Sequence, residues 1–391
     1  MLKSNILPIH SRLDIKFSYG KGVYLYDVND KKYLDFGSGI AVNIFGHCYP
    51  KLVETLKNQA EKLWHISNLY QIEELEDFAR NITKNTFADY AFLCNSGSEA
   101  VECGIKMVRK YFYNQKKPEK NRIITFKGAF HGRSIAIISA SQNPKYLEGF
   151  APFLEGFDQA EFNNINSVAK LITNKTAAIL IEPIQGEQGI RVADKKFITD
   201  LRRLASQNNL LLFFDEVQSG VGRTGHLYAY DYYGVKPDIV SSAKGLGGGF
   251  PVGACLATKE AASGMGIGSH GTTYGGNPIA TKIANFVINE VLKEGFLDNV
   301  NQTGLLLKER LSLLQKEFPK IIDEIRGLGL MLGIKINIQY SNLKIVENLA
   351  KEGLLVIPAG ENVIRILPPL IIKENHIEEF YAIIKRVLET F

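Results

Sequence analysis

The chain has 391 residues, of which 45% are hydrophobic, so it can form a large core and more than one domain. Its 46 basic and 41 acidic residues are interspersed and leave a net charge of +5; because no recognition motif is present, we expect no nucleic-acid partner. No stretch approaches about 18 consecutive apolar residues, the N-terminus lacks the features of a signal or transit peptide, and the four cysteines lack metal-ligand spacing, so we expect a cytoplasmic protein without a membrane span or a bound metal.

The N-terminal region predicts a β-hairpin and then a helix. Apolar residues alternate over 20–36 around the turn sequence DVND, which is typical of two antiparallel strands. Over 50–64, Leu52, Leu56 and Ala60 recur at helical spacing.

From about residue 86 the chain alternates between short apolar runs and amphipathic helices. This alternation predicts a mainly parallel sheet with helices on both faces, and ligands that bind beyond the carboxyl ends of the strands. One helix has Val101, Ile105 and Val108 on one face, and another has Phe197 and Leu201. The predicted strands are 90–94, 123–126, 177–182, 210–215 and 238–244.

The last third of the sequence predicts a smaller α+β unit. A long helix begins after about residue 280, and short apolar strands follow at 329–336 and 362–367. We expect the N-terminal hairpin to pack with this unit, because the hairpin has no other sheet to join. The predicted division is an N-terminal segment at 1–50, a large domain at 51–280 and a small domain at 281–391.

Four sequence features directly follow predicted strands, and the first is NSGSEA at 95–100. Gly97 lets the backbone approach a ligand closely, and the N–H groups of Gly97 and Ser98 lie at the positive end of the next helix. This arrangement suits a phosphate group. The alternative is an ordinary helix cap by Ser96 or Ser98, with Glu99 in the first turn.

The second feature, GAFHGR at 128–133, brings an aromatic ring, a histidine and an arginine to one strand end. Phe130 can stack on a flat ring, and Arg133 can bind a carboxylate. The alternative is a surface loop with a buried phenylalanine.

The third feature, FFDEVQSGVGRTG at 213–225, ends an apolar strand with Asp215. Burying a carboxylate is costly unless a cationic group pairs with it. A helix cap or a salt bridge to an arginine would satisfy Asp215, and so would the protonated nitrogen of a bound aromatic ring.

The fourth feature, SSAKGLGGGFPVGA at 241–254, places Lys244 at a strand end before a glycine-rich turn. The order of residues matches neither a P-loop nor a dinucleotide-binding fingerprint. A partly desolvated lysine has a lowered pKa and can form a Schiff base with an aldehyde.

Together, the four features predict a ligand with a phosphate, a flat ring, a protonated ring nitrogen and an aldehyde. Pyridoxal phosphate (PLP) has all of these groups, and we expect it as the cofactor. Asp215 would keep the ring nitrogen protonated. Lys244 would bond the aldehyde and later carry a proton between the substrate carbon and the cofactor carbon.

At these residues the sequence resembles the class III PLP-dependent aminotransferases of fold type I, and the resemblance covers essentially the whole chain. The matching motifs also include GSGIAVNIFGHCYP (37–50), EPIQGEQG (182–189) and GTTYGGNP (271–278). The resemblance implies an α/β fold, in which helices cover both faces of a mainly parallel central sheet, plus a smaller α+β domain.

The resemblance implies roles for individual residues of the cofactor site. Gly97 and Ser98 match the phosphate-binding pair, and Lys244 matches the Schiff-base lysine. Thr272 matches a substrate contact. Thr273 matches a phosphate ligand that the other subunit supplies in the family, and this match implies a homodimer with shared active sites. In the remaining cofactor positions, Phe130 stacks on the ring, Asp215 contacts the ring nitrogen, Glu216 lies in the same segment, Val217 lies behind the ring and Gln218 lies near the phenolic oxygen.

Three further matches concern the substrates. Arg365 matches the arginine that binds the α-carboxylate of 2-oxoglutarate or glutamate, and Glu187 matches the glutamate that neutralises it when the other substrate presents a terminal amine. A mobile carboxylate removes the cost of leaving a guanidinium unpaired. Arg133 would hold the far carboxylate of either substrate. The alternatives are a structural ion pair for Arg365 and a solvated loop position for Glu187.

Within the class, SGIAVN (38–43) and WHISNLY (64–70) are most similar to enzymes that act on N-acetylornithine. The similarity implies transfer of the ω-amino group of N-acetyl-L-ornithine to 2-oxoglutarate, which gives N-acetylglutamate semialdehyde and glutamate in arginine biosynthesis. Ser98 departs from this subgroup, which often has alanine there. The alternatives are N-succinyl-diaminopimelate (lysine biosynthesis), ornithine or 4-aminobutyrate as the donor, or else a decarboxylase, a racemase or a non-enzymatic PLP protein on the same fold.

Overall fold

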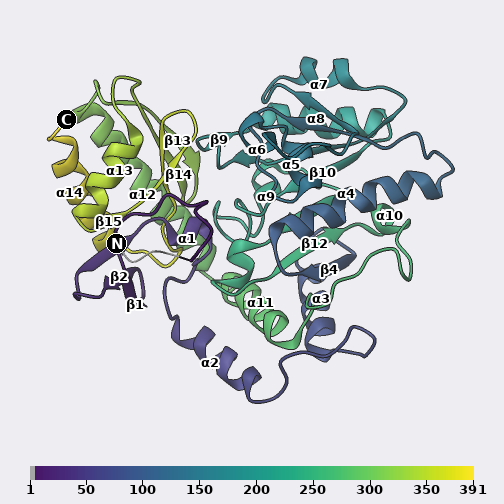
Figure 1. The fold of residues 1–391 in the computed structure, drawn as a ribbon, viewed down its shortest axis with the longest axis horizontal. Coiled ribbons are helices and arrows are strands. Elements are labelled where there is room, and N and C mark those ends of the chain that lie inside the picture. The colour runs from purple at the N-terminus through teal and green to yellow at the C-terminus, as the bar shows by residue number, and fades with distance from the viewer. Residues whose placement is uncertain (1–4) are drawn as a thin grey trace.

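A seven-stranded sheet forms the centre of the larger lobe in the computed structural model, which describes residues 5–391 (Figure 1). Strand β12 (Gly253–Ala257) runs antiparallel to both of its neighbours, and the other strands run parallel to one another. This mainly parallel sheet confirms the predicted fold class. In sheet order, the strands are β4 (Tyr90–Cys94), β12, β11 (Ile239–Ser242), β10 (Leu211–Asp215), β7 (Thr176–Ile181), β5 (Arg122–Phe126) and β6 (Phe157–Ala160).

Helices cover both faces of this sheet, as predicted. Side chains alternate between the faces, so that Phe214 of β10 belongs to one buried apolar cluster and Phe213 to the other. Helix α4 (Gly97–Asn114) lies on the Phe213 face, at such short range that a Cβ on Gly104 would come within 2.3 Å of the Phe213 ring. Helix α8 (Lys195–Gln207) packs on the opposite face.

Shorter elements complete the larger lobe. The helix predicted at 50–64 ends at Ala60, and α2 and α3 both pack against α11. The additional elements are α2 (Pro50–Ala60), α3 (Glu73–Lys84), α5 (Ile135–Ser141), α6 (Pro144–Leu147), α7 (Ile165–Leu171), β8 (Ile184–Gln185), β9 (Arg191–Val192), α9 (Ala229–Tyr233), α10 (Lys259–Ala262) and α11 (Pro278–Val291).

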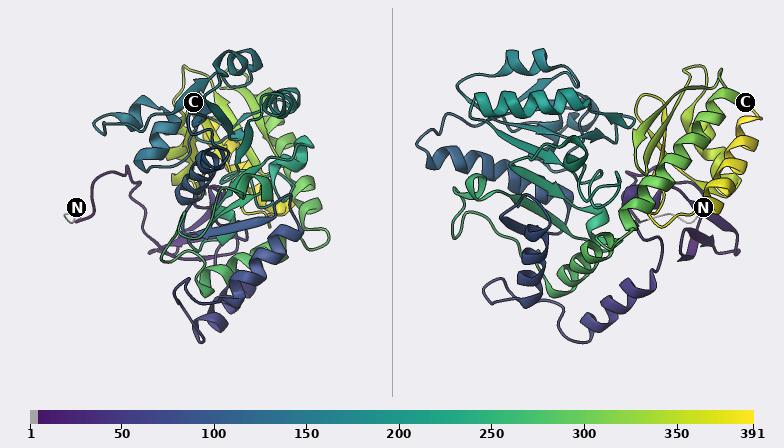
Figure 2. Two further views of the ribbon diagram at one scale, coloured as in Figure 1. Left: turned by 90° about the vertical axis from the view of Figure 1, so that its right-hand side faces the viewer. Right: turned by 180° about the vertical axis from the view of Figure 1, so that it is seen from behind.

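The smaller lobe combines both ends of the chain. Residues 5–16 form no helix or strand and lead to β1 beside the C-terminal elements (Figure 2). The predicted hairpin forms, because β2 pairs antiparallel with β3, and β3 then pairs in parallel with β15. One sheet is β1 (Phe17–Lys21), β2 (Tyr24–Asp27), β3 (Lys32–Asp35) and β15 (Leu354–Leu355), and the other is β13 (Ile322–Leu328), β14 (Met331–Ile336), β17 (Val363–Ile366) and β16 (Ile357–Ala359). The helices are α1 (Ser38–Ala41), α12 (Phe296–Glu317), α13 (Asn342–Lys351) and α14 (Glu374–Leu388).

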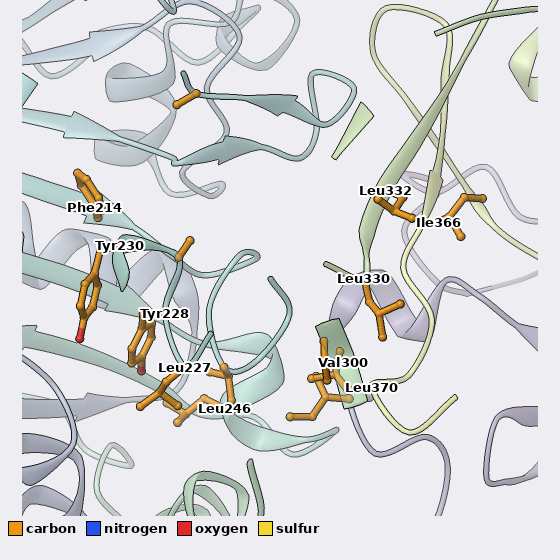
Figure 3. Packing of buried hydrophobic residues seen from close by; sticks show 14 of the residues in the cluster. Phe214, Leu227, Tyr228, Tyr230, Leu246, Val300, Leu330, Leu332, Ile366 and Leu370 are labelled. Atoms are coloured by element: carbon orange, nitrogen blue, oxygen red, sulfur yellow. The ribbon is translucent and has the colours of Figure 1, made fainter. Parts of the chain in front are cut away.

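The two lobes share one continuous apolar core. Phe214 and Tyr228 of the larger lobe belong to the same buried cluster as Leu330 and Ile366 of the smaller lobe (Figure 3). The predicted boundary at residue 281 falls inside α11, and the division into three parts stays a prediction.

Residues 5–391 contain neither a candidate membrane span nor a candidate metal site. None of their helices has the length and apolar character that crossing a membrane requires. No group of three or more His, Cys, Asp or Glu side chains in this range could hold a metal ion.

Candidate active site

The carboxyl ends of the parallel strands surround a cavity of about 410 Å³, a size that suits a small ligand. All four strand-end features of the sequence contribute to its wall, although they are far apart along the chain. The predicted site residues that line the cavity are Gly97, Ser98, Phe130, Arg133, Asp215, Val217, Gln218 and Lys244.

Asp215 is the last residue of β10, and its buried carboxylate borders the cavity. One oxygen lies 2.7 Å from Nδ1 of the buried His131, and the other accepts hydrogen bonds from Ser241 Oγ (3.2 Å) and the Val217 N–H (3.1 Å). Among residues 5–391, no arginine or lysine forms an ion pair with Asp215, and it caps no helix. The structure therefore supports neither of the alternatives that we considered for this acid.

Lys244 enters the cavity from the next strand. The chain leaves β11 two residues earlier, and Lys244 has a positive φ of 47°, a conformation that non-glycine residues adopt mainly where the surroundings enforce it. Desolvation lowers the pKa of its amine to about 8, with Arg365 lowering it further and Glu187, Asp215 and Glu182 opposing. The neutral amine, which is the form that attacks an aldehyde, therefore predominates above about pH 8.

The start of α4 forms one wall of the cavity. Ser96 caps the helix by accepting the Glu99 N–H at 3.3 Å, which leaves Gly97 and Ser98 to present the first N–H groups of the helix. A Cβ on Gly97 would lie 2.8 Å from Val217, so the close approach of these two segments requires glycine. The helix cap that we considered as an alternative is therefore present, and Ser96 makes it. This cap uses the N–H of Glu99 and does not use those of Gly97 and Ser98.

Ser98 contributes its hydroxyl group to the neighbouring loop. Its Oγ accepts a hydrogen bond from the backbone N–H of Arg133 at 3.3 Å. A Cβ on Gly132 would lie 2.1 Å from the same oxygen, so the hydroxyl fills the space beside this glycine. An alanine at position 98 could not make this contact.

Arg365 and Glu187 form an ion pair beside Lys244. Arg365, on β17 of the smaller lobe, is 2% exposed and donates from Nη1 and Nη2 to the two carboxylate oxygens of Glu187, at 2.6 and 3.3 Å. Both residues influence the pKa of Lys244. They lie outside the residues that line the cavity, but within electrostatic range of its lysine.

Besides Arg365 and Glu187, three further predicted site residues do not line the cavity. The Glu216 carboxylate points away from it and accepts the N–H groups of Ala229 (2.6 Å) and Tyr230 (2.9 Å) in the first turn of α9. Burial raises the pKa of Glu216 to about 7. Its carboxylate therefore holds α9, and a place for Glu216 in the cofactor segment stays a prediction. The other two are Thr272 and Thr273, of which Thr273 is exposed.

Sequence reasoning assigned no role to two buried groups of this site. His131 holds the Asp215 carboxylate, and Glu182 accepts the Phe130 N–H at 2.9 Å. Burial and the nearby Asp215 carboxylate raise the pKa of Glu182 well above its ordinary value. The signal for Glu182 was available, because it directly follows strand β7 and so occupies a strand end like the other site residues.

The residues of this cavity fit PLP. Among residues 5–391 the Asp215 carboxylate borders the cavity with no arginine or lysine partner, and a protonated ring nitrogen could supply the missing charge. Gln218 Oε1 and His131 Nε2 are buried and have no hydrogen-bond partner in the described part of the chain. The same cavity is lined by the Gly97 backbone, which suits a phosphate, and by Phe130 and Val217, which suit the two faces of a ring. Lys244, with its lowered pKa, lines it too.

Comparison with known proteins also identifies an aminotransferase. The class-III aminotransferase family matches residues 9–388. The acetylornithine aminotransferase of Agrobacterium fabrum (strain C58) is 52% identical over 95% of this chain and 93% of its own. A structure of the ornithine aminotransferase from Toxoplasma gondii gives a TM-score of 0.94 at 29% identity, and the match covers 99% of this chain and 92% of that chain. That structure has partial occupancy of PLP at its active site. The N-acetylornithine aminotransferase structure from Stenotrophomonas maltophilia K279a gives 0.84 at 34% identity, covering 97% and 96%.

Proposed function

The chain belongs to the class-III aminotransferase family and is a PLP-dependent aminotransferase, and we propose that it moves the ω-amino group of N-acetyl-L-ornithine to 2-oxoglutarate. The products are N-acetylglutamate semialdehyde and glutamate. The observation that carries this proposal is the Arg365–Glu187 ion pair beside Lys244, because it suits an enzyme with two unlike substrates.

We assign the cofactor to the cavity residues. Gly97 and Ser98 would bind the phosphate, and Asp215 would hold the ring nitrogen protonated. Phe130 and Val217 would contact the ring faces, and Gln218 Oε1 would gain the partner it lacks. When bound, PLP withdraws electrons from the substrate carbon that carries the amino group, which makes the proton on that carbon acidic.

Lys244 then acts as the base. Its Nζ takes the proton from the substrate carbon and later returns it on the other side of the transferred nitrogen. The pKa of Lys244, lowered to about 8, gives this amine a larger neutral fraction near neutral pH than an ordinary lysine has. Asp215 does not take part in this proton transfer; His131 and Ser241 hold its carboxylate in one orientation.

The ion pair explains how one site accepts both substrates. With acetylornithine, the reacting end carries no carboxylate, and Glu187 neutralises Arg365 as observed. With glutamate or 2-oxoglutarate, the α-carboxylate takes the place of Glu187 on the same guanidinium. Arg133 would bind the remaining carboxylate of either substrate at the far side of the cavity.

We also propose a cytoplasmic homodimer in which Thr272 and Thr273 serve the partner's site. Asn68 donates hydrogen bonds to two carbonyls of loop 271–276, so this loop and the segment around Trp64 lie side by side. Trp64 and Tyr274 are 67% and 63% exposed, which supports burial of this surface in a second copy. Sedimentation of the holoenzyme tests the dimer, and a fully active monomer would contradict it.

The substrate is tested by steady-state kinetics with four amine donors and 2-oxoglutarate as the acceptor. We expect kcat/KM to be highest for N-acetylornithine. N-succinyl-diaminopimelate also offers a carboxylate for Arg133 and an acylated amine, so a higher kcat/KM for it would reassign the substrate to lysine biosynthesis. A higher kcat/KM for ornithine or 4-aminobutyrate than for N-acetylornithine would show that the enzyme does not require an acylated amine.

Replacing Glu187 with alanine should change the balance between the two half-reactions. Without it, the buried Arg365 guanidinium stays unpaired when an ω-amine binds, at a cost of about 1–3 kcal/mol, whereas glutamate supplies its own carboxylate. The ratio of kcat/KM for glutamate to that for acetylornithine should therefore rise about tenfold or more. The matched control is Glu361→Ala, which removes a glutamate that pairs with Arg326 in the smaller lobe. An unchanged ratio in Glu187→Ala would show that the pair is only structural.

A further inference from the structure

Two aromatic rings contact the guanidinium of Arg133. The guanidinium carbon lies 3.9 Å from the centroid of the Tyr146 ring and 5.3 Å from that of the Phe130 ring. The two rings are 5.8 Å apart and nearly perpendicular, at 83°. Within residues 5–391, Arg133 forms no ion pair with a carboxylate, and its side chain is exposed. Its charge is therefore stabilised by ring faces, which leave its N–H groups available to a ligand.

Tyr146 belongs to a short helix that the surrounding structure fixes in place. Asn143 caps α6 by accepting the N–H of Lys145 at 3.1 Å, and its carbonyl accepts the N–H of Tyr146 at 2.9 Å. Gln142, just before the cap, donates to the carbonyl of Phe157 on β6 at 3.1 Å. The ring is therefore carried by a turn that is tied to the edge of the central sheet, which suits it to hold the exposed side chain of Arg133.

We propose that Tyr146 is a positioning residue that sets substrate specificity: its ring fixes the Arg133 guanidinium where it binds the second carboxylate of the substrate. This inference rests on the proposed function, in which Arg133 holds the carboxylate farthest from the reacting carbon. The ligand class is an oxo acid or acylated amino acid with a carboxylate at that far end.

The physical reason is that a free arginine side chain has many conformations, and binding a carboxylate must select one of them. An arginine side chain loses much of this rotamer freedom when a ligand holds it in one conformation. A contact with a ring face favours one arrangement before the ligand arrives, and it stabilises the cation most where ligand binding removes water from the pair. Loss of the Tyr146 ring should therefore weaken carboxylate binding by on the order of tenfold.

The test compares two acceptors that differ only at the far end. 2-Oxoglutarate has the second carboxylate, and 2-oxopentanoate has the same chain length without it. In Tyr146→Leu, we expect KM for 2-oxoglutarate to rise on the order of tenfold, with kcat and the KM for 2-oxopentanoate changed less than about twofold. Tyr146→Phe keeps the ring and should behave like the unsubstituted enzyme. Calorimetric binding of glutarate to the holoenzyme should weaken by the same factor in Tyr146→Leu, independently of turnover.

The double variant Tyr146→Leu/Arg133→Ala separates positioning from a general effect. If Tyr146 acts through Arg133, adding Tyr146→Leu to Arg133→Ala should change the KM for 2-oxoglutarate no further. Equal changes for both acceptors, additive effects in the double variant, or loss of affinity in Tyr146→Phe would each overturn the inference. If the unsubstituted enzyme treats the two acceptors alike, the proposed role of Arg133 is wrong, and the inference falls with it. Unchanged cofactor absorbance and melting temperature in Tyr146→Leu would verify its fold.

Discussion

Replacing Lys244 with alanine should lower kcat for every amine donor by at least about 10⁴-fold, the upper range for removing a positioned base. The reason is that, in the mechanism we propose, one amine serves twice, bonding the cofactor aldehyde and carrying the proton. Arg365, Glu187 and Asp215 all act on its pKa, so no other described lysine has this environment. Single-turnover kinetics with acetylornithine measure the effect directly, and dialysis shows whether PLP still binds.

The matched control is Lys127→Ala. Lys127 follows strand β5 as Lys244 follows β11, but it is exposed and pairs with Glu161 outside the cavity. We expect kcat to stay within about twofold, because surface ion pairs contribute little. Retention of normal turnover in Lys244→Ala would remove the lysine from the mechanism.

Replacing Asp215 with asparagine should lower kcat by on the order of 10² to 10³-fold, the range found when one group that stabilises charge in the transition state is removed. Asparagine keeps the size of the side chain and can keep the contacts with Ser241 and Val217. It cannot stabilise a protonated ring nitrogen, so removal of the proton from the substrate carbon becomes slow. A primary isotope effect with donor deuterated at that carbon should increase as this step becomes limiting.

Glu216→Gln is the control for this variant, because it also replaces a buried carboxylate with an amide, one residue further along the chain. Its carboxylate holds α9 and points away from the cavity, so we expect kcat to change by less than about threefold, with any loss confined to stability. Near-normal turnover in Asp215→Asn, or an equal loss in Glu216→Gln, would contradict the role of Asp215.

The sequence predicted the central sheet and most of the cavity, for one physical reason. In a parallel sheet the carboxyl ends of the strands meet at one edge, so residues that follow apolar strands converge even when they are distant in the chain. Asp215 ends such a strand and Gly97, Arg133 and Lys244 each follow one, and the structure places all four around one cavity.

Strand polarity and side-chain direction could not be predicted in the same way. The segment at 253–257 reads as the end of a glycine-rich turn, yet it forms the antiparallel strand β12 between β11, which precedes it, and β4, which lies far earlier in the chain. Glu216 has the same sequence context as Asp215, but successive side chains of an extended chain point to opposite sides. Its carboxylate therefore meets α9 and not the cavity. The contact of Tyr146 with Arg133 depends on the path of the chain after α5, which no local pattern specifies.

The central claim is that this aminotransferase takes its amino group from the ω-position of N-acetylornithine. The most direct measurement mixes the yellow holoenzyme with N-acetylornithine alone, without an acceptor, and follows the cofactor absorbance. We predict loss of the absorbance of the lysine-bound cofactor, formation of one equivalent of N-acetylglutamate semialdehyde per site, and recovery of the original spectrum on adding 2-oxoglutarate. An unchanged spectrum with N-acetylornithine, in a protein whose spectrum N-succinyl-diaminopimelate or ornithine does change, would contradict the claim.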